Sequence, residues 1–259
     1  MEIEKSSGHS KESKMNTLQR IFVMLFLVNA GTSPVWADNA VYIDQVGSGA
    51  DIDITQDGSG NRISDNADDT TKMKVDGSDI NLSIDTVGDT NKVLGAIIGD
   101  NSDVDLNIDG DTNTVTIDID GTDTYGAGSG NVVIDLDGGN NTLDLSIGNN
   151  DQATGADVDW IVDGDYNSIT ADIDINNATN SIDFAGDNVS IDYDGDGYDG
   201  HSVTIDGVGT TNYWDIEVIQ ESTLQTDTLS IEIEGSGDTH TDNTLCVSQS
   251  DSGTATGCQ

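Results

Sequence analysis

The chain has 259 residues, of which 49 are acidic and only 8 basic, so its formal net charge is −41 at pH 7. So acidic a surface repels nucleic acid and anionic membranes, which excludes functions that need a basic patch. Hydrophobic residues still make up 34% of the sequence, and Val, Ile and Leu recur at regular intervals, which argues against a wholly disordered acidic chain.

Residues 1–37 are predicted to be a secretory signal peptide, with Met15 as an alternative start. The only long apolar run, IFVMLFLV at 21–28, follows a basic residue, and Ala37 offers a small side chain at the expected cleavage point. The run is too short for a membrane-spanning helix. We therefore expect a secreted, extracellular cell-surface protein whose mature chain, residues 38–259, does not insert into a membrane.

The mature chain opens with a short pattern that occurs twice. In VYIDQVGSGADIDITQDGSGN, which begins at Val41, apolar and polar residues alternate and each copy breaks at a glycine. Alternation places Ile43 and Gln45 on one face of an extended strand, and glycine permits the positive φ of a tight turn. One such unit cannot bury its inner face alone, so a tandem array must stack.

This doubled pattern resembles the curlin repeat, which is found in the subunits of curli, the amyloid-like surface fibres of bacteria. The matching positions are Gln45, Gly47, Gln56, Gly58 and Asn61. The resemblance implies a β-solenoid of strand-turn-strand rungs, in which the glutamine and asparagine side chains form ladders between rungs. It also implies adhesion or a biofilm matrix as the usual context, with self-association or homologous fibre subunits as partners.

Later units keep the alternation and the turn glycine, and they predict further strands in chain order. Their expected inward residues are Ile52/Ile54, Ile63, Met73/Val75, Ile80/Leu82/Ile84, Val93/Ile97, Val104/Leu106/Ile108, Val115/Ile117/Ile119, Val132/Ile134/Leu136, Leu143/Leu145/Ile147, Val158/Trp160/Val162, Ile169/Ala171/Ile173, Ile182/Phe184, Val189/Ile191/Tyr193, Val203/Ile205, Trp214/Ile216/Val218, Leu229/Ile231/Ile233 and Leu245/Val247. Strand starts about 11 residues apart predict an all-β solenoid of about 22 residues per rung, with nine or ten rungs.

Residues 38–259 are expected to form a single domain without helices. The spacing lengthens at 122–130, 149–155, 194–200 and 220–226, which we interpret as loops at rung corners. The inward position before the turn holds glutamine in the first two units but an aliphatic residue in later ones, such as Ile108 or Leu136. An aliphatic core favours a self-contained solenoid over a stack held by polar ladders.

Acidic residues recur at outward strand positions, where stacked like charges repel unless salt screens them or divalent cations bridge them. Asp192, Asp194 and Asp196, in DYDGDG, match the opening of a calcium-binding loop. An EF-hand is excluded because Val203 stands where its glutamate would be. These three aspartates are the candidate calcium ligands, and no other cofactor is expected.

The two cysteines, Cys246 and Cys258, are predicted to form a disulfide near the C-terminus, as an even pair does in an exported chain. Enzymatic activity is not expected. His201 and His240 are isolated in the sequence, no nucleophile motif is present, and the acidic residues are too many to single out a catalytic pair.

The sequence thus favours a secreted structural or adhesive surface protein that forms fibres by end-to-end strand addition. Two alternatives stay open. One is a monomeric, calcium-binding acidic solenoid of a surface layer. The other is a fibre or decoration protein of a marine phage, although the signal peptide argues against it.

Overall fold

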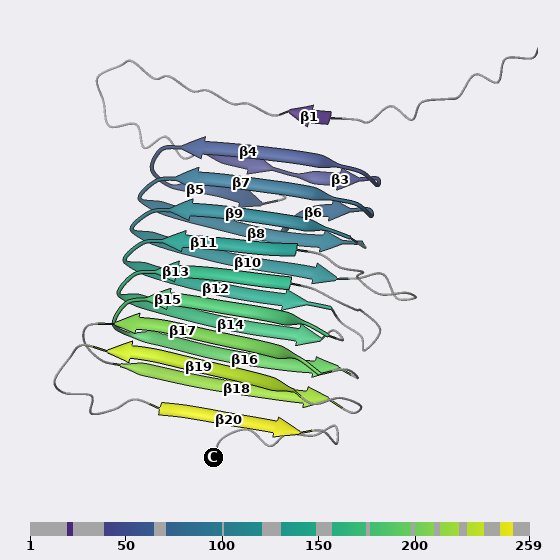
Figure 1. The fold of residues 1–259 in the computed structure, drawn as a ribbon. Helices are drawn as coiled ribbons and strands as arrows, with labels where there is room; N and C mark the ends of the chain where they lie inside the picture. The colour runs from purple at the N-terminus through teal and green to yellow at the C-terminus, as the bar shows by residue number, and fades with distance from the viewer. Residues whose placement is uncertain are drawn as a thin grey trace, which may run out of the picture.

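The computed structural model describes residues 20–22, 39–64, 71–99, 101–120, 131–148, 157–174, 177–197, 200–209, 213–222, 227–235 and 244–250. These residues form strands and turns and contain no helix. The strands coil around a common axis and stack in two parallel sheets, so the fold is a β-solenoid, as predicted (Figure 1).

Sheet A is the front layer of Figure 1. Its order is β1 (Arg20–Phe22), β4 (Asp51–Asp57), β7 (Asn81–Val87), β9 (Asp103–Asp109), β11 (Asn131–Asp137), β13 (Asp157–Asp163), β15 (Thr179–Ala185), β17 (Ser202–Gly209) and β19 (Thr228–Gly235). β1 comes from the segment predicted to be a signal peptide, and it pairs in parallel with β4.

Sheet B is the second layer. Its path is β2 (Ala40–Tyr42), β5 (Asn61–Ser64), β8 (Thr90–Ile98), β10 (Thr112–Asp120), β12 (Asn140–Ile147), β14 (Tyr166–Asp174), β16 (Val189–Gly197), β18 (Trp214–Ser222) and β20 (Thr244–Ser250). Two further short strands belong to the first rungs of this sheet: β3 (Asp44–Val46) pairs with β6 (Met73–Asp76), which pairs in turn with β8.

The rungs are longer than predicted. Val158 pairs with Asn180, which is 22 residues later, but Ile52 pairs with Leu82, which is 30 residues later. The mean rung is roughly 26 residues, so the stack holds fewer coils than the nine or ten expected. The strand-and-turn repeat of 22 residues is present, and insertions at the corners lengthen the other rungs.

The core lies between the two sheets and consists of inward residues that the alternation predicted, except that Leu229, Ile231 and Ile233 are only partly buried and Leu245 and Val247 are exposed. The side chains along β4, β9 and β13 alternate strictly between exposed and buried. Trp160 and Tyr193 are the bulkiest of the fully buried side chains, and the ring of Phe184 meets that of Trp214 edge-on at 6.2 Å. Each buried aliphatic side chain contributes about 1.5–3 kcal/mol.

Two of the predicted loops begin too early. β16 continues to Gly197 and β18 to Ser222, so residues 194–197 and 220–222 are strand. Strand pairing with a complete neighbouring rung extends both segments, because each backbone group finds a partner there. The predicted loops at 122–130 and 149–155 lie outside the described residues.

None of the described residues forms a helix that is long and apolar enough to cross a membrane.

Candidate assembly edges and carboxylate columns

The five residues of the repeat pattern lie together in the first coils. Gln45 is half-buried in β3, and its amide makes only a long contact of 3.4 Å with the carbonyl oxygen of Val46. Gln56 is buried in β4, and its Oε1 has no hydrogen-bond partner among the described residues. The two glutamines therefore lie in opposite sheets at the same end of the stack, with hydrogen-bonding capacity to spare.

The turn glycines have backbone conformations that favour glycine. Gly47 has φ +133° and Gly58 has φ +152°. A Cβ atom on Gly58 would also lie 2.7 Å from the side-chain nitrogen of Asn39. The backbone conformation favours glycine at this corner, whereas the side chain of Asn39 could move aside.

Asn61 is the first well-buried member of an asparagine ladder. The register places it in one column with asparagines of the next four rungs, namely Asn91, Asn113, Asn141 and Asn167. Side-chain amides link Asn91 to Asn113, Asn113 to Asn141 and Asn141 to Asn167 at 3.0, 2.9 and 3.1 Å. The ladder ends at β16, where Val189 takes the position.

Each ladder asparagine also holds the backbone of its corner. The amide of Asn91 donates to the carbonyl oxygen of Asp109 at 2.8 Å, and that of Asn113 donates to the carbonyl oxygen of Asp137 at 3.0 Å. The signal for this ladder is the spacing G-x-x-N, which recurs at the corners that lead from sheet A to sheet B, after Gly58, Gly88, Gly110, Gly138 and Gly164. The sequence shows that later units often keep this asparagine, but only Asn61 was singled out from it, and the later members were not identified as a ladder.

A second amide ladder lies at the C-terminal end and was also missed. Gln249 in β20 donates from Nε2 to Oε1 of Gln220 in β18 at 2.7 Å, and Gln220 donates in turn to the carbonyl oxygen of Thr228 at 3.2 Å. The signal was available, because WDIEVIQ and LCVSQ repeat the alternation that ends in glutamine. Glutamine therefore marks both ends of the stack, and aliphatic residues fill its middle.

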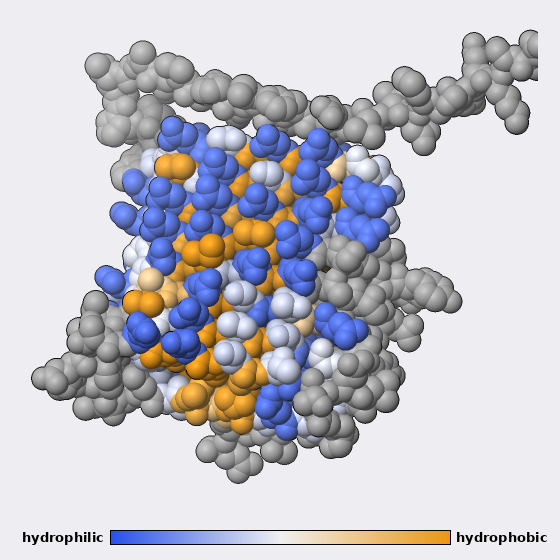
Figure 2. Space-filling model, viewed as in Figure 1, coloured by the Kyte–Doolittle hydropathy of each residue, from blue (hydrophilic) through white to orange (hydrophobic). Residues whose placement is uncertain are grey.

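Both ends expose strand edges. Among the described residues, no strand pairs with the outer edges of β2, β3, β19 or β20. The inward side chains of β20 are largely uncovered, with Leu245 56% and Val247 44% exposed. Figure 2 shows hydrophobic residues at this end of the front face, whereas hydrophilic residues dominate near the other end. Unpaired parallel edges with apolar inner faces are templates for further strands.

Carboxylates form columns on the outside of both sheets. On sheet A, Asp109, Asp137 and Asp163 stand opposite one another on consecutive strands. Strands lie about 4.8 Å apart, so these charges repel. Burial raises the pKa of Asp135, and the charges of Asp163, Asp137 and Asp105 raise it further.

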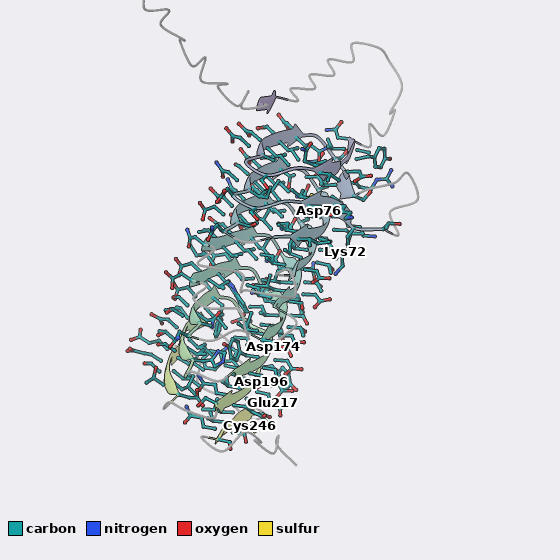
Figure 3. The ribbon with its side chains drawn as sticks, turned by 90° about the vertical axis from the view of Figure 1, so that its right-hand side faces the viewer. Lys72, Asp76, Asp174, Asp196, Glu217 and Cys246 are labelled. Atoms are coloured by element: carbon teal, nitrogen blue, oxygen red, sulfur yellow. The ribbon has the colours of Figure 1, made fainter. Side chains whose placement is uncertain are left out.

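The outer face of sheet B is most acidic in the C-terminal half. Asp174, Asp196, Glu217 and Cys246 follow one another down the stack in Figure 3, on β14, β16, β18 and β20. Burial raises the pKa of Asp194 to about 6, helped by the charges of Asp172, Glu221, Asp196 and Asp192. The chain has no Lys or Arg beyond residue 92.

Asp192, Asp194 and Asp196 do not form the calcium-binding loop that their spacing suggested. They lie at alternate positions of β16, all exposed on its outer face, and alternate residues of a strand are about 6.7 Å apart. Gly195, expected in a turn, is buried in the strand against the ring of Tyr193. Among the described residues, no group of three or more His, Cys, Asp or Glu side chains converges as a metal site.

A groove of about 550 Å³ follows the corners between sheets A and B in the middle of the stack. It is lined by turn backbone and by a row of carboxylates, namely Asp89, Asp109, Asp111, Asp137 and Asp165. Hydrated cations are the ligands that the charge of this groove favours.

A buried polar cluster lies at the opposite corner near the C-terminal end. His201 is fully buried, and its backbone N–H donates to Oδ1 of Asp227 at 3.0 Å, while Ser222 donates to Oδ2 at 3.3 Å. Burial lowers the pKa of His201, although Asp227 and Asp196 oppose this effect. The polar groups serve the fold here, since they tie β17, β18 and β19 together.

Cys246 lies on the outer face of β20. Cys258 lies outside the described residues, so the pairing of the two cysteines stays a prediction.

These features define the chain as an acidic β-solenoid with an asparagine ladder along one corner and glutamines at both ends. No known family model, curated protein or solved structure matches it.

Proposed function

We propose that this chain is a secreted structural protein of the cell surface that assembles end to end by strand addition and serves adhesion or a matrix. One observation carries the proposal: both ends of the solenoid present parallel strand edges that no other described strand covers. An added copy would satisfy the backbone groups of these edges and bury their apolar residues. The resemblance of residues 41–61 to the curlin repeat supports the same role.

The charge of the chain sets a condition for this assembly. Copies with a net charge near −41 repel one another, so we expect assembly to need salt or divalent cations. The decisive experiment is electron microscopy with thioflavin fluorescence on the purified residues 38–259, with and without millimolar calcium. Fibres with an axial repeat of about 4.8 Å support the proposal. Discrete short rods under every condition refute it.

A second candidate function is binding of divalent cations by a monomeric surface-layer solenoid. The raised pKa values of Asp135, Asp183 and Asp194 favour it, because in each case burial and then neighbouring carboxylates oppose ionisation. Cations placed along the columns would relieve that repulsion. Calcium should then raise the melting temperature more than sodium at equal ionic strength. Equal effects of the two ions would show that calcium acts only by screening the charges and not by specific binding.

A further inference from the structure

At its two ends, the solenoid does not stop at the same level in both sheets. After residue 38, the chain enters the stack in sheet B, through β2 and β3, and the described chain leaves it in sheet B, through β20. Sheet B therefore projects half a coil beyond sheet A at both ends, apart from β1. When two copies approach head to tail, β20 meets β2 and β3 of the next copy before the edges of sheet A can meet.

These two projecting edges lie on the same columns of inward residues. Following the register from strand to strand, one column contains Gln45, Val75, Ile97, Ile119, Ile147, Ile173, Gly195, Gln220 and Gln249. A second column begins at Val41 and ends at Leu245. Val247 lies between Leu245 and Gln249 on the inner face, as Ile43 does between Val41 and Gln45. The inward residues of both edges are thus two aliphatic residues followed by a glutamine, at matching positions.

The charge of β20 is a further sign that another chain covers it. Natural edge strands usually carry charged residues that prevent pairing with other molecules. β20, with the sequence TLCVSQS, has no charged residue at all in a chain with 49 acidic ones. Its expected neighbours, β2 and β3, contain a single charge, on Asp44. Stacking β20 on β2 and β3 would therefore avoid the pairs of facing carboxylates that occur on the outer faces within the stack.

We propose, on the basis of the function proposed above, that copies of this chain join head to tail through sheet B alone. β20 of one copy pairs in parallel with β2 and β3 of the next, so that Leu245, Val247 and Gln249 lie beside Val41, Ile43 and Gln45 of the second copy. Gln249 already donates to Gln220 at 2.7 Å, and the amide of the incoming Gln45 continues this ladder. The half-exposed Leu245 and Val247 become core.

The same junction leaves sheet A incomplete. Because β20 and β2 stand between them, β19 and the next β4 lie two strand spacings apart, with room for one strand. β1 occupies the corresponding position beside β4 in the present structure, so this edge accepts a parallel strand. The gap is filled where residues 20–22 are retained and open where they are removed.

Complementary charges at the glutamine column test the register. Gln249→Lys keeps a donor for Gln220, and Gln45→Glu places the opposite charge on the facing strand. Each variant alone sets an unpaired charge inside one type of junction, so fibre elongation, followed by thioflavin fluorescence and electron microscopy, should fall about tenfold or more. An equimolar mixture of the two variants should restore elongation, because in a fibre in which they alternate every junction joins either Lys to Glu or the two original glutamines.

Controls place the same charges on the outer faces of the same strands. Thr244→Lys and Tyr42→Glu should elongate like the unchanged chain, and circular dichroism should show the same melting for all variants. Misfolded variants cannot rescue each other, so recovery in the mixture is specific to the junction.

If the unchanged chain forms fibres but the single variants elongate normally, or the mixture does not recover, this register is wrong and the assembly function stands. If the unchanged chain forms no fibres under any condition, the proposed function fails and the junction fails with it.

Discussion

The side-chain amide of Asn113 donates to the side-chain oxygen of Asn141 at 2.9 Å, and both residues are buried at the same corner of consecutive rungs. The same amide also reaches the carbonyl oxygen of Asp137 at 3.0 Å. One side chain therefore connects two rungs and holds the turn between them.

We expect Asn113→Ala to destabilise the solenoid by about 1–3 kcal/mol, because it removes the hydrogen bonds that the Asn113 side chain makes with the carbonyl oxygen of Asp137, with Asn141 and with Asn91. Thermal unfolding followed by circular dichroism measures the loss. Thr114→Ala changes the next, outward residue and should have little effect. Equal losses in both variants would show that the ladder adds nothing specific.

Stacked turn glycines should tolerate no side chain. Gly164 has φ +154°, and a Cβ atom there would collide with the carbonyl oxygen of Gly138 in the preceding rung. Gly164→Ala should therefore cost several kcal/mol or prevent folding, since backbone cannot move aside as a flexible side chain can. Gly139→Ala is the matched control, because its nearest neighbour would be the carbonyl oxygen of Asp111 at 3.6 Å. Soluble yield and thermal unfolding measure the difference between the two variants.

Asp194 should make the fold less stable at neutral than at acid pH. Its pKa is raised from 3.8 to about 6, so the folded chain binds this proton more tightly than the unfolded chain. The stabilisation is fully present below pH 3.8 and is lost as pH rises through about 6.

The variant Asp194→Asn should remove this dependence and raise stability at pH 7 by at most about 1 kcal/mol, since solvent screens the half-exposed carboxylate. Melting temperatures from pH 3.5 to 7.5 test this, with Asp215→Asn as a control on the same sheet. A profile that Asp194→Asn leaves unchanged would contradict the expectation.

His201 acts in the opposite direction. Burial lowers its pKa, so the folded chain binds this proton less tightly, and stability present above the ordinary histidine pKa is lost as pH falls below it. The variant His201→Gln should lose part of this acid sensitivity. Hydrogen exchange of the β17 to β19 region at pH 5 and pH 7 measures it locally. A region whose opening shows the same pH response in both proteins would exclude His201 as the cause.

Alternation was enough to predict the fold, because burial of one strand face repeats at every second residue. Thus Val115, Ile117 and Ile119 were identified as core residues before any pairing was known, and all three are buried. Alternation could not show whether the segment at Asp192 forms a calcium-binding loop. Whether D-x-D-x-D-G bends depends on the neighbouring rung, and there the pairing of β16 with β14 and β18 keeps the segment extended.

The register between strands is the second property that could not be predicted from the sequence. The column that joins Gln45 to Gln249 runs through seven intervening residues, and only the pairing of every strand in between reveals it. The glutamines at its two ends are 204 positions apart in the sequence.

The corners that lead from sheet A to sheet B consist of two or three residues from β4 through β16, whereas the corners leading back vary more widely in length. Glycine stacking and the asparagine ladder leave no room for insertion on the first side. Additional residues are thus accommodated away from the axis, and each rung still advances the stack by one strand. The height of this molecule is set by how many times the chain goes round, and a lineage could enlarge its loops without altering that dimension.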